Sequence, residues 1–182
     1  MKDFRLLRFT LTVIAVISFF GIASADSNVA VRDGHVYRIV NASDSRAMKS
    51  NTNGEITVAA SNAADQSQLW LAEAQGEGYY MRSLADGHYI TSPRARAQVW
   101  KTQYAIEPVS ESMLLRFVPD NGQWYIHTVE DYGKADDRDT NGYAIVNSYS
   151  KVAGGVSTNA SSHWDIVEVD DITADQIAVY KA

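Results

Sequence analysis

Cysteine is absent from this sequence of 182 residues. Without cysteine the chain has no disulfide framework, so its stability must come from a sizeable hydrophobic core. Hydrophobic residues make up 46% of the chain, which is enough to build such a core in one globular domain. A sustained apolar period of 3.6 residues is also missing, except for a short helical hint near Thr173 and Gln176. The sequence therefore predicts an all-β domain.

Catalytic motifs are missing as well. The sequence has no Gly-x-Ser-x-Gly elbow and no glycine-rich loop of the kind that cradles phosphate. The histidines are scattered, none pairs with another at the spacing of metal ligands, and we expect them on exposed strands or turns. We therefore predict that the protein is not an enzyme and uses no cofactor. The histidines are His35, His88, His127 and His163.

An excess of positive charge is the third absence. The formal net charge is −6, with 16 basic against 22 acidic residues. A moderately acidic domain is soluble and binds polyanions poorly. We therefore expect no nucleic-acid partner, and we expect a monomer.

The first 25 residues have the pattern of a secretory signal peptide. A basic start is followed by an apolar run over residues 11–22 and by the small-residue exit Ala23-Ser24-Ala25. The apolar run is too short to span a membrane easily. We expect cleavage before Asp26, a lead-in over residues 26–35, and a secreted or periplasmic protein without a membrane anchor.

Three large aromatic residues recur at equal spacing. Trp70, Phe117 and Trp164 are 47 residues apart in both intervals, and each lies in a strand-like apolar run. A shorter run that begins with Tyr precedes each of them, at Tyr37, Tyr80 and Tyr125. A period of roughly 20–50 residues is typical of repeat architectures. We therefore expect three copies of one unit with these aromatic residues as core anchors.

Each unit is expected to contain four short strands. About twelve strands in one open sheet would leave exposed edges, and closing them into a barrel removes those edges. Three equivalent units around one axis make a β-trefoil over residues 36–170, with repeats of about 36–78, 79–122 and 123–170 and a C-terminal tail over 171–182. The strand-like segments are 36–40, 47–49, 56–60, 68–72, 79–84, 89–91, 99–106, 114–118, 124–129, 143–146 and 163–169.

The segment Gln68-Leu69-Trp70 resembles the Q-x-W motif of ricin-B-type lectin domains in bacterial secreted proteins. The turn and strand at Asp86-Gly87-His88-Tyr89-Ile90 add to the resemblance, which covers about residues 36–170. The second repeat has Leu115-Arg116-Phe117 and the third has Ser162-His163-Trp164 in place of the full motif. Persistence of the aromatic residue without Gln is what a core role predicts, and we expect the Gln68 amide to bond backbone near a turn.

The resemblance implies a carbohydrate-binding module and a set of candidate site residues. Sites of this type use an early Asp, a stacking aromatic and a later Asn or Gln, because aromatic rings suit the apolar face of a pyranose and polar groups fix its hydroxyls. In the third repeat these roles fall to Asp137 or Asp139, Tyr149 and Asn159, which is our first choice. The first repeat offers Asp44 or Lys49 but no aromatic before Trp70. The second choice is the set Asp86, Trp100 and Tyr104.

Three other interpretations of the sequence concern a calcium ion, a protein partner and a glycan-degrading system. The segment Asp137-x-Asp139-x-Asn141-Gly142 matches half of a calcium loop, but the twelfth position is Ser148 rather than Glu, so we predict no metal. A protein-binding trefoil is the alternative function, such as a protease inhibitor that presents the segment 92–96. A third possibility is an accessory domain of a glycan-degrading system.

Overall fold

The computed structural model describes residues 30–92, 99–103, 114–129, 142–170 and 172. The expected signal peptide and the helical hint in the C-terminal tail lie outside the described residues. Four strands belong to each repeat, and one short 3-10 helix, η1 (Gln66–Gln68), precedes β4. The strands are β1 (Val36–Asn41), β2 (Arg46–Ser50), β3 (Ile56–Ala60), β4 (Trp70–Gln75), β5 (Gly78–Ser83), β6 (Tyr89–Thr91), β7 (Lys101–Gln103), β8 (Leu115–Asp120), β9 (Gln123–Thr128), β10 (Tyr143–Val146), β11 (Val152–Gly155) and β12 (His163–Glu168).

The first and last strands of the three repeats form a closed barrel. All neighbours pair antiparallel, in the order β1, β4, β5, β8, β9 and β12, and β12 returns to pair with β1 along five residue pairs from Tyr37↔Glu168 to Asn41↔Trp164. Closure removes the exposed edges that an open sheet would have. Together with three four-stranded repeats, this confirms the β-trefoil predicted from the sequence.

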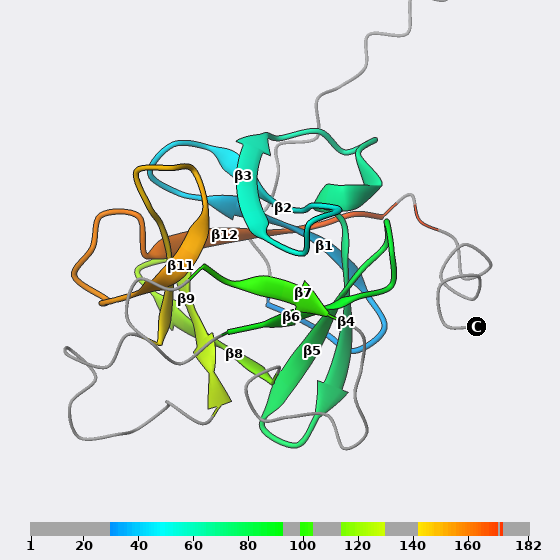
Figure 1. Cartoon of the computed structure of the whole chain (residues 1–182). Coiled ribbons are helices and arrows are strands. Elements are labelled where there is room, and N and C mark those ends of the chain that lie inside the picture. The colour runs from blue at the N-terminus through cyan, green and yellow to red at the C-terminus, as the bar shows by residue number, and fades with distance from the viewer. Residues whose placement is uncertain (1–29, 93–98, 104–113, 130–141, 171, 173–182) are drawn as a thin grey trace, which may run out of the picture.

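The middle strands of each repeat form hairpins that meet over one end of the barrel. The hairpins β2–β3, β6–β7 and β10–β11 are joined by the bridges Glu55↔Lys101, Thr57↔Lys151 and Val99↔Ala153. Figure 1 shows β3, β7 and β11 above β5 and β8. The strands of these hairpins therefore gather at one end of the molecule.

Strand pairing defines which residues are equivalent in the three repeats. In each repeat, one residue of the last strand pairs with the second residue of the first strand: Tyr37↔Trp70, Tyr79↔Leu115 and Trp124↔Trp164. Trp70, Leu115 and Trp164 are all fully buried in the main core. These three residues are therefore the equivalent anchors.

The sequence-based register was wrong in the second repeat. Phe117 is only partly buried and packs against the main core. Its ring makes an edge-to-face contact with the ring of Tyr79, with 6.1 Å between the ring centroids. Leu115 and Phe117 lie on the same face of β8 because side chains in a strand alternate with a period of two. The leading residues shift as well, because Tyr79 and Trp124, rather than Tyr80 and Tyr125, are equivalent to Tyr37.

Trp100 belongs to the core of the hairpin cap. Its backbone N–H donates to the Val152 carbonyl at 2.8 Å, and its carbonyl accepts from the Ile56 N–H at 3.0 Å. All three residues are fully buried. The ring of Trp100 therefore has no exposed face on which a sugar can stack, which corrects its place in the second-choice site.

The sequence pattern missed β11. This strand contains Gly154 and Gly155, and glycine is depleted in strands because it has no side chain to pack. Here the absence of a side chain is required: a Cβ on Gly155 would lie 2.5 Å from the Ile145 Cδ1 on the paired strand β10.

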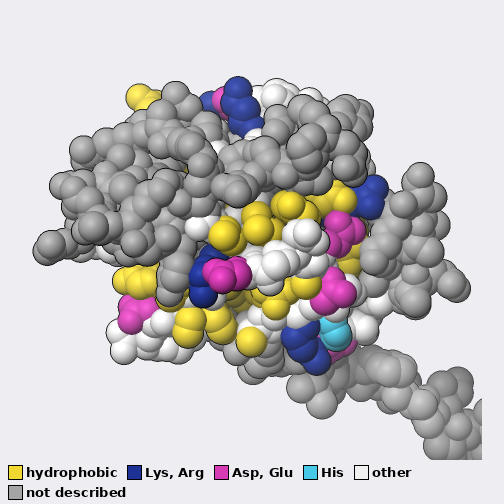
Figure 2. Space-filling model, turned by 90° about the horizontal axis from the view of Figure 1, so that it is seen from below, with side chains coloured by type: hydrophobic (Ala, Val, Ile, Leu, Met, Phe, Trp, Pro, Cys, Tyr) yellow, Lys and Arg dark blue, Asp and Glu magenta, His cyan; other side chains and the backbone are white. Residues whose placement is uncertain are grey.

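The segment before β1 is attached to the base of the barrel. The Gly34 N–H donates to the Ala72 carbonyl at 2.8 Å, and the Tyr79 hydroxyl donates to the Val31 carbonyl at 2.9 Å. Arg32 Nη2 also donates to Glu168 Oε1 at 2.6 Å. The last residues of the expected lead-in are thus bound to the barrel. Figure 2 shows the molecule from this side, where described hydrophobic, acidic and basic side chains are mixed.

Candidate functional site

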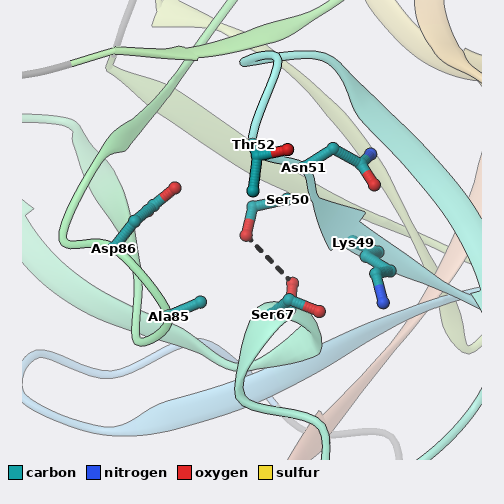
Figure 3. A pocket seen from close by; sticks show the side chains of 7 residues that line it. All are labelled: Lys49, Ser50, Asn51, Thr52, Ser67, Ala85 and Asp86. Carbon is teal, nitrogen blue, oxygen red and sulfur yellow. Dashed lines mark hydrogen bonds between the residues drawn. The ribbon is translucent and has the colours of Figure 1, made fainter.

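A cleft of about 310 Å³ lies where the first and second repeats meet. One wall is the end of β2 and the β2–β3 turn, the second is η1, and the third is the β5–β6 turn. Figure 3 shows Asp86 and Ala85 on one side of the cleft and Asn51 and Lys49 on the other. The lining residues are Lys49, Ser50, Asn51, Thr52, Ser67, Ala85 and Asp86.

The β2–β3 turn is fixed by local hydrogen bonds. The Gly54 N–H donates to the Asn51 carbonyl at 2.8 Å, and Gly54 has a φ of 76°, which glycine adopts without strain. The Asn51 side chain donates to the Glu55 carbonyl and to Thr57 Oγ1, both at 2.9 Å. This turn was expected from Asn53-Gly54, and it holds Asn51 and Thr52 at the mouth of the cleft.

The wall at η1 is organised by Asp65. Its carboxylate caps η1 by accepting from the Ser67 N–H at 3.1 Å and from the Ser67 hydroxyl, and it accepts from Lys49 Nζ at 3.0 Å. The hydrogen bonds from Ser67, followed by the bond from Lys49, hold the pKa of Asp65 below its usual range. Lys49 is therefore held beside an ionised partner at the edge of the cleft.

Gln68 supports this wall from behind. Its amide nitrogen donates to the Ala60 carbonyl at 3.0 Å, and its amide oxygen accepts from the Asn62 N–H at 2.9 Å. The Gln of the Q-x-W motif thus bonds backbone near a turn, as predicted. It holds the loop between β3 and β4 in place and does not line the cleft.

The floor of the cleft is a chain of hydroxyl contacts. Ser50 Oγ lies 2.9 Å from Ser83 Oγ and donates to the Ser67 carbonyl at 3.4 Å, the bond drawn in Figure 3. Ser50 and Ser83 are buried. These contacts connect the first repeat to β5 of the second.

The third wall carries Asp86. Its Oδ1 accepts from the His88 N–H at 3.1 Å, and the Gly87 N–H closes the turn on the Ser83 carbonyl at 2.9 Å. Among the described residues, Oδ2 has only a contact of 3.5 Å with His88 Nδ1. A carboxylate oxygen is therefore available at the cleft as a hydrogen-bond acceptor.

The lining suits a small ligand with several hydroxyl groups. Asp86 supplies an acceptor, Lys49 supplies a donor, and hydroxyl and amide groups can do both. Ala85 is the one apolar side chain among the lining residues, and aromatic rings are absent from that lining. Recognition in this cleft therefore depends on hydrogen bonding rather than on stacking.

The candidate residues named from the sequence have different outcomes. Asp137, Asp139 and Tyr104 lie outside the described residues. Tyr149 is on the β10–β11 turn with 80% of its surface exposed. The Asn159 side-chain oxygen accepts from the Ser161 N–H at 2.9 Å and from the Ser161 hydroxyl at 2.8 Å. Asp86 is the one member of either set that lines the cleft.

The other lining residues were missed, apart from Lys49, which was noted only for its place in the first repeat. The first repeat contributes two segments to the lining, residues 49–52 and Ser67, and the next repeat contributes Ala85 and Asp86. A search for sites inside one repeat cannot join these segments. The pairing of β4 with β5 across the repeat boundary is the feature that points to a site between repeats.

None of the four histidines is as exposed as the sequence predicted, because three are partly buried and one is buried. His127 is buried, and its Nδ1 lies 3.0 Å from the Thr128 carbonyl oxygen. His163 Nε2 lies 2.9 Å from Asp120 Oδ2, and this contact is the largest cause of the lowered pKa of Asp120.

Within the described ranges no group of three or more His, Asp or Glu side chains is arranged to hold a metal ion. The half calcium loop at 137–142 falls almost entirely outside those ranges.

Comparison with known proteins identifies the architecture. No protein-family model matches the chain, and no curated protein sequence does. A lectin described as ricin B-like from Macrolepiota procera, in complex with lactose, superposes with a TM-score of 0.61 at 15% identity, over 78% of this chain and 100% of that one. The chain has the β-trefoil fold of this lectin.

Two further structures agree on the fold. The designed threefold-symmetric protein ThreeFoil gives a TM-score of 0.61 at 13% identity, over 74% of this chain and 99% of that one. A GlcNAcα1-4Gal-releasing endo-β-galactosidase from Clostridium perfringens gives 0.61 at 14% identity over 75% of this chain. The trefoil spans only 33% of that galactosidase.

Proposed function

We propose that the protein is a lectin-like, carbohydrate-binding β-trefoil and that the cleft beside Asp86 holds the sugar. The observation that carries this proposal is a cleft of about 310 Å³ lined by hydroxyl, amide, ammonium and carboxylate groups with one carboxylate oxygen available. Such groups exchange their hydrogen bonds with water for hydrogen bonds to sugar hydroxyls. Ligand pockets use a few polar groups in this way to fix the orientation of the ligand.

The comparisons support the same class of ligand. The Macrolepiota procera lectin binds lactose, and a Polyporus squamosus lectin with a TM-score of 0.57 binds a sialylated trisaccharide epitope. These ligands belong to those proteins, which are 15% and 17% identical to this chain. They support a glycan as the ligand class and leave the particular sugar to experiment.

The lining favours binding over hydrolysis. Most glycoside hydrolases use two carboxyl groups about 5–10 Å apart on either side of the scissile bond. Asp86 is the one acidic residue among those that line the cleft. We therefore propose a protein without catalytic activity, although one structural neighbour is an endo-β-galactosidase.

The remaining properties follow from the sequence. We propose a secreted or periplasmic monomer whose exported form begins at Asp26, which an intact-mass measurement of the exported protein would test. Among the described residues no helix is long and apolar enough to cross a membrane. The net charge of −6 favours neither a polyanion nor an anionic membrane as a partner.

The proposal is tested on a broad glycan array. We compare the wild type with Asp86→Asn, which keeps an oxygen to accept from the His88 N–H but removes the charge. Loss of a charge-assisted hydrogen bond should weaken binding about 10- to 100-fold. Asp170→Asn, which removes one negative charge from an exposed position outside the cleft, is the matched control and should bind like the wild type.

Two results of this experiment would contradict the proposal. A wild type that binds no glycan would contradict the function. Binding that survives Asp86→Asn but is lost in Tyr149→Ala would retain the function and move the site to the third repeat.

A further inference from the structure

The β1–β2 turn of the first repeat has the same construction as the β5–β6 turn beside the cleft. The Ser45 N–H donates to the Asn41 carbonyl at 2.8 Å, as the Gly87 N–H does to the Ser83 carbonyl at 2.9 Å. Ser45 and Gly87 both have positive φ, at 60° and 72°. In each turn the preceding Asp accepts from the backbone N–H two residues later, at 3.0 Å for Asp44 and 3.1 Å for Asp86. Asp44 is thus the equivalent of Asp86.

The opposite walls also match. The Gly54 N–H donates to the Asn51 carbonyl at 2.8 Å, and the Ser150 N–H donates to the Asn147 carbonyl at 3.0 Å. Gly54 and Ser150 both have positive φ, at 76° and 58°. The β10–β11 turn therefore faces Asp44 across the meeting of the third and first repeats, as the β2–β3 turn faces Asp86. We call these two meeting places the Arg46 seam and the His88 seam, after the residue two positions beyond each Asp.

An arginine crosses one seam. Arg46 Nε and Nη2 donate to Asp44 Oδ2 at 2.9 and 2.7 Å, and Arg46 Nη1 donates to Ser150 Oγ at 2.6 Å. At the His88 seam, the residue equivalent to Arg46 is His88, and the residue equivalent to Ser150 is Gly54, which has no side chain. The open cleft of about 310 Å³ lies at this second seam.

We infer that the residue two positions after the turn Asp sets the number of ligand sites: His88 leaves its seam open, and Arg46 occupies the equivalent seam as an internal substitute for a ligand. This inference rests on the proposed function. Of the two seams that the structure describes, the protein then presents one to a glycan. Arg46 and His88 are positioning residues, because each acts through its Asp.

A sugar does not displace Arg46 readily for two physical reasons. Hydrogen bonds between guanidinium and carboxylate are charge-assisted, and they are roughly twice as strong as those of a neutral hydroxyl. The arginine is also attached to the same chain, so it competes at a high effective concentration. Asp44 is therefore occupied before any ligand arrives.

The inference is tested by exchanging the two residues. His88→Arg should fill the His88 seam and reduce glycan binding on the array at least 10-fold, although every lining residue is unchanged. Gln75→Arg, which adds an arginine at an exposed position that does not line the cleft, is the matched control and should bind within twofold of the wild type. Arg46→His should keep the existing site and open the second, so that calorimetric titration with the strongest array glycan gives two sites in place of one.

Crystal structures of His88→Arg and Arg46→His without ligand provide a readout that does not depend on any sugar. We expect the introduced arginine to pair with Asp86 and fill the present cleft, and we expect a new cleft beside Asp44 in Arg46→His. A cleft that stays open in His88→Arg, or binding of this variant at the wild-type level, would overturn the inference. A wild type that binds no glycan would contradict the proposed function alone, because the two structures would still show whether these residues open and close the seams.

Discussion

Three buried side chains hold equivalent positions in the barrel core. Trp70 and Trp164 each donate an indole N–H to a backbone carbonyl, of Met48 at 3.3 Å and of Ala144 at 2.8 Å. Leu115 fills the same position in the second repeat without a polar group to satisfy. Replacement of Trp by Leu is therefore tolerated in the core, provided that the surrounding residues fill the volume.

The register of the second repeat gives a direct test. Leu115→Ala should lower the free energy of unfolding by about 2–5 kcal/mol, because it leaves a cavity in a packed interior. Phe117→Ala should lower it by less, at about 1–2 kcal/mol, since the ring is only partly buried. Urea denaturation of both variants measures the difference. A larger loss for Phe117→Ala would restore the register predicted from equal spacing.

Part of this residue-scale account could be predicted from the sequence. The burial of Trp70 and Trp164 and the backbone role of Gln68 followed from the size of an aromatic ring and the chemistry of an amide. Leu115 could not be distinguished from Phe117, because both lie on the inward face of one strand and only cross-strand pairing fixes their depth. The burial of Trp100 could not be predicted either, because it depends on the meeting of three hairpins.

At the scale of single elements, β10 and β11 depend on a glycine. A Cβ at position 155 would lie 2.5–2.7 Å from three side-chain carbons of Ile145. Gly155→Ala should therefore lower the free energy of unfolding by about 1–3 kcal/mol through overpacking. The same substitution in an Ile145→Ala background should have less than half this effect, as measured in a double-mutant cycle by urea denaturation. Equal effects in both backgrounds would mean that the contact with Ile145 is not the cause.

The attachment of the N-terminal segment to β12 predicts a pH dependence. The hydrogen bond from Arg32, followed by that from His35, holds the pKa of Glu168 below its usual range. A depressed pKa means that the ionised carboxylate stabilises the fold at pH values above the ordinary Glu value of about 4.3 and that this contribution disappears as the pH falls through the folded-state pKa.

Glu168→Gln should accordingly lower the melting temperature by a few degrees at pH 7. The difference from the wild type should shrink as the pH falls below about 4, because Glu168 then becomes protonated. Thermal melts of both proteins from pH 3 to pH 7 provide the measurement. A difference that stays constant across this range would show that the charge of Glu168 contributes nothing.

At the scale of the whole molecule, the fold was predictable and the cleft was not. Repeats of similar length, short alternating strands and a Q-x-W motif sufficed for a β-trefoil. The cleft needs Lys49 and Ser67 from one repeat and Asp86 from the next to come together, and their distances along the chain carry no sign of it. The β4–β5 hairpin brings them together, because it pairs the last strand of the first repeat with the first strand of the second.

The proposed function requires a glycan to bind between Asp86 and the β2–β3 turn. A crystal structure of the wild type with the strongest glycan from the array would locate the bound sugar. We expect sugar density at the His88 seam, with a hydroxyl group within hydrogen-bond distance of Asp86 Oδ2 and further contacts to Lys49 or Ser67. Sugar density beside Tyr149 and Asn159, with the His88 seam empty, would contradict it.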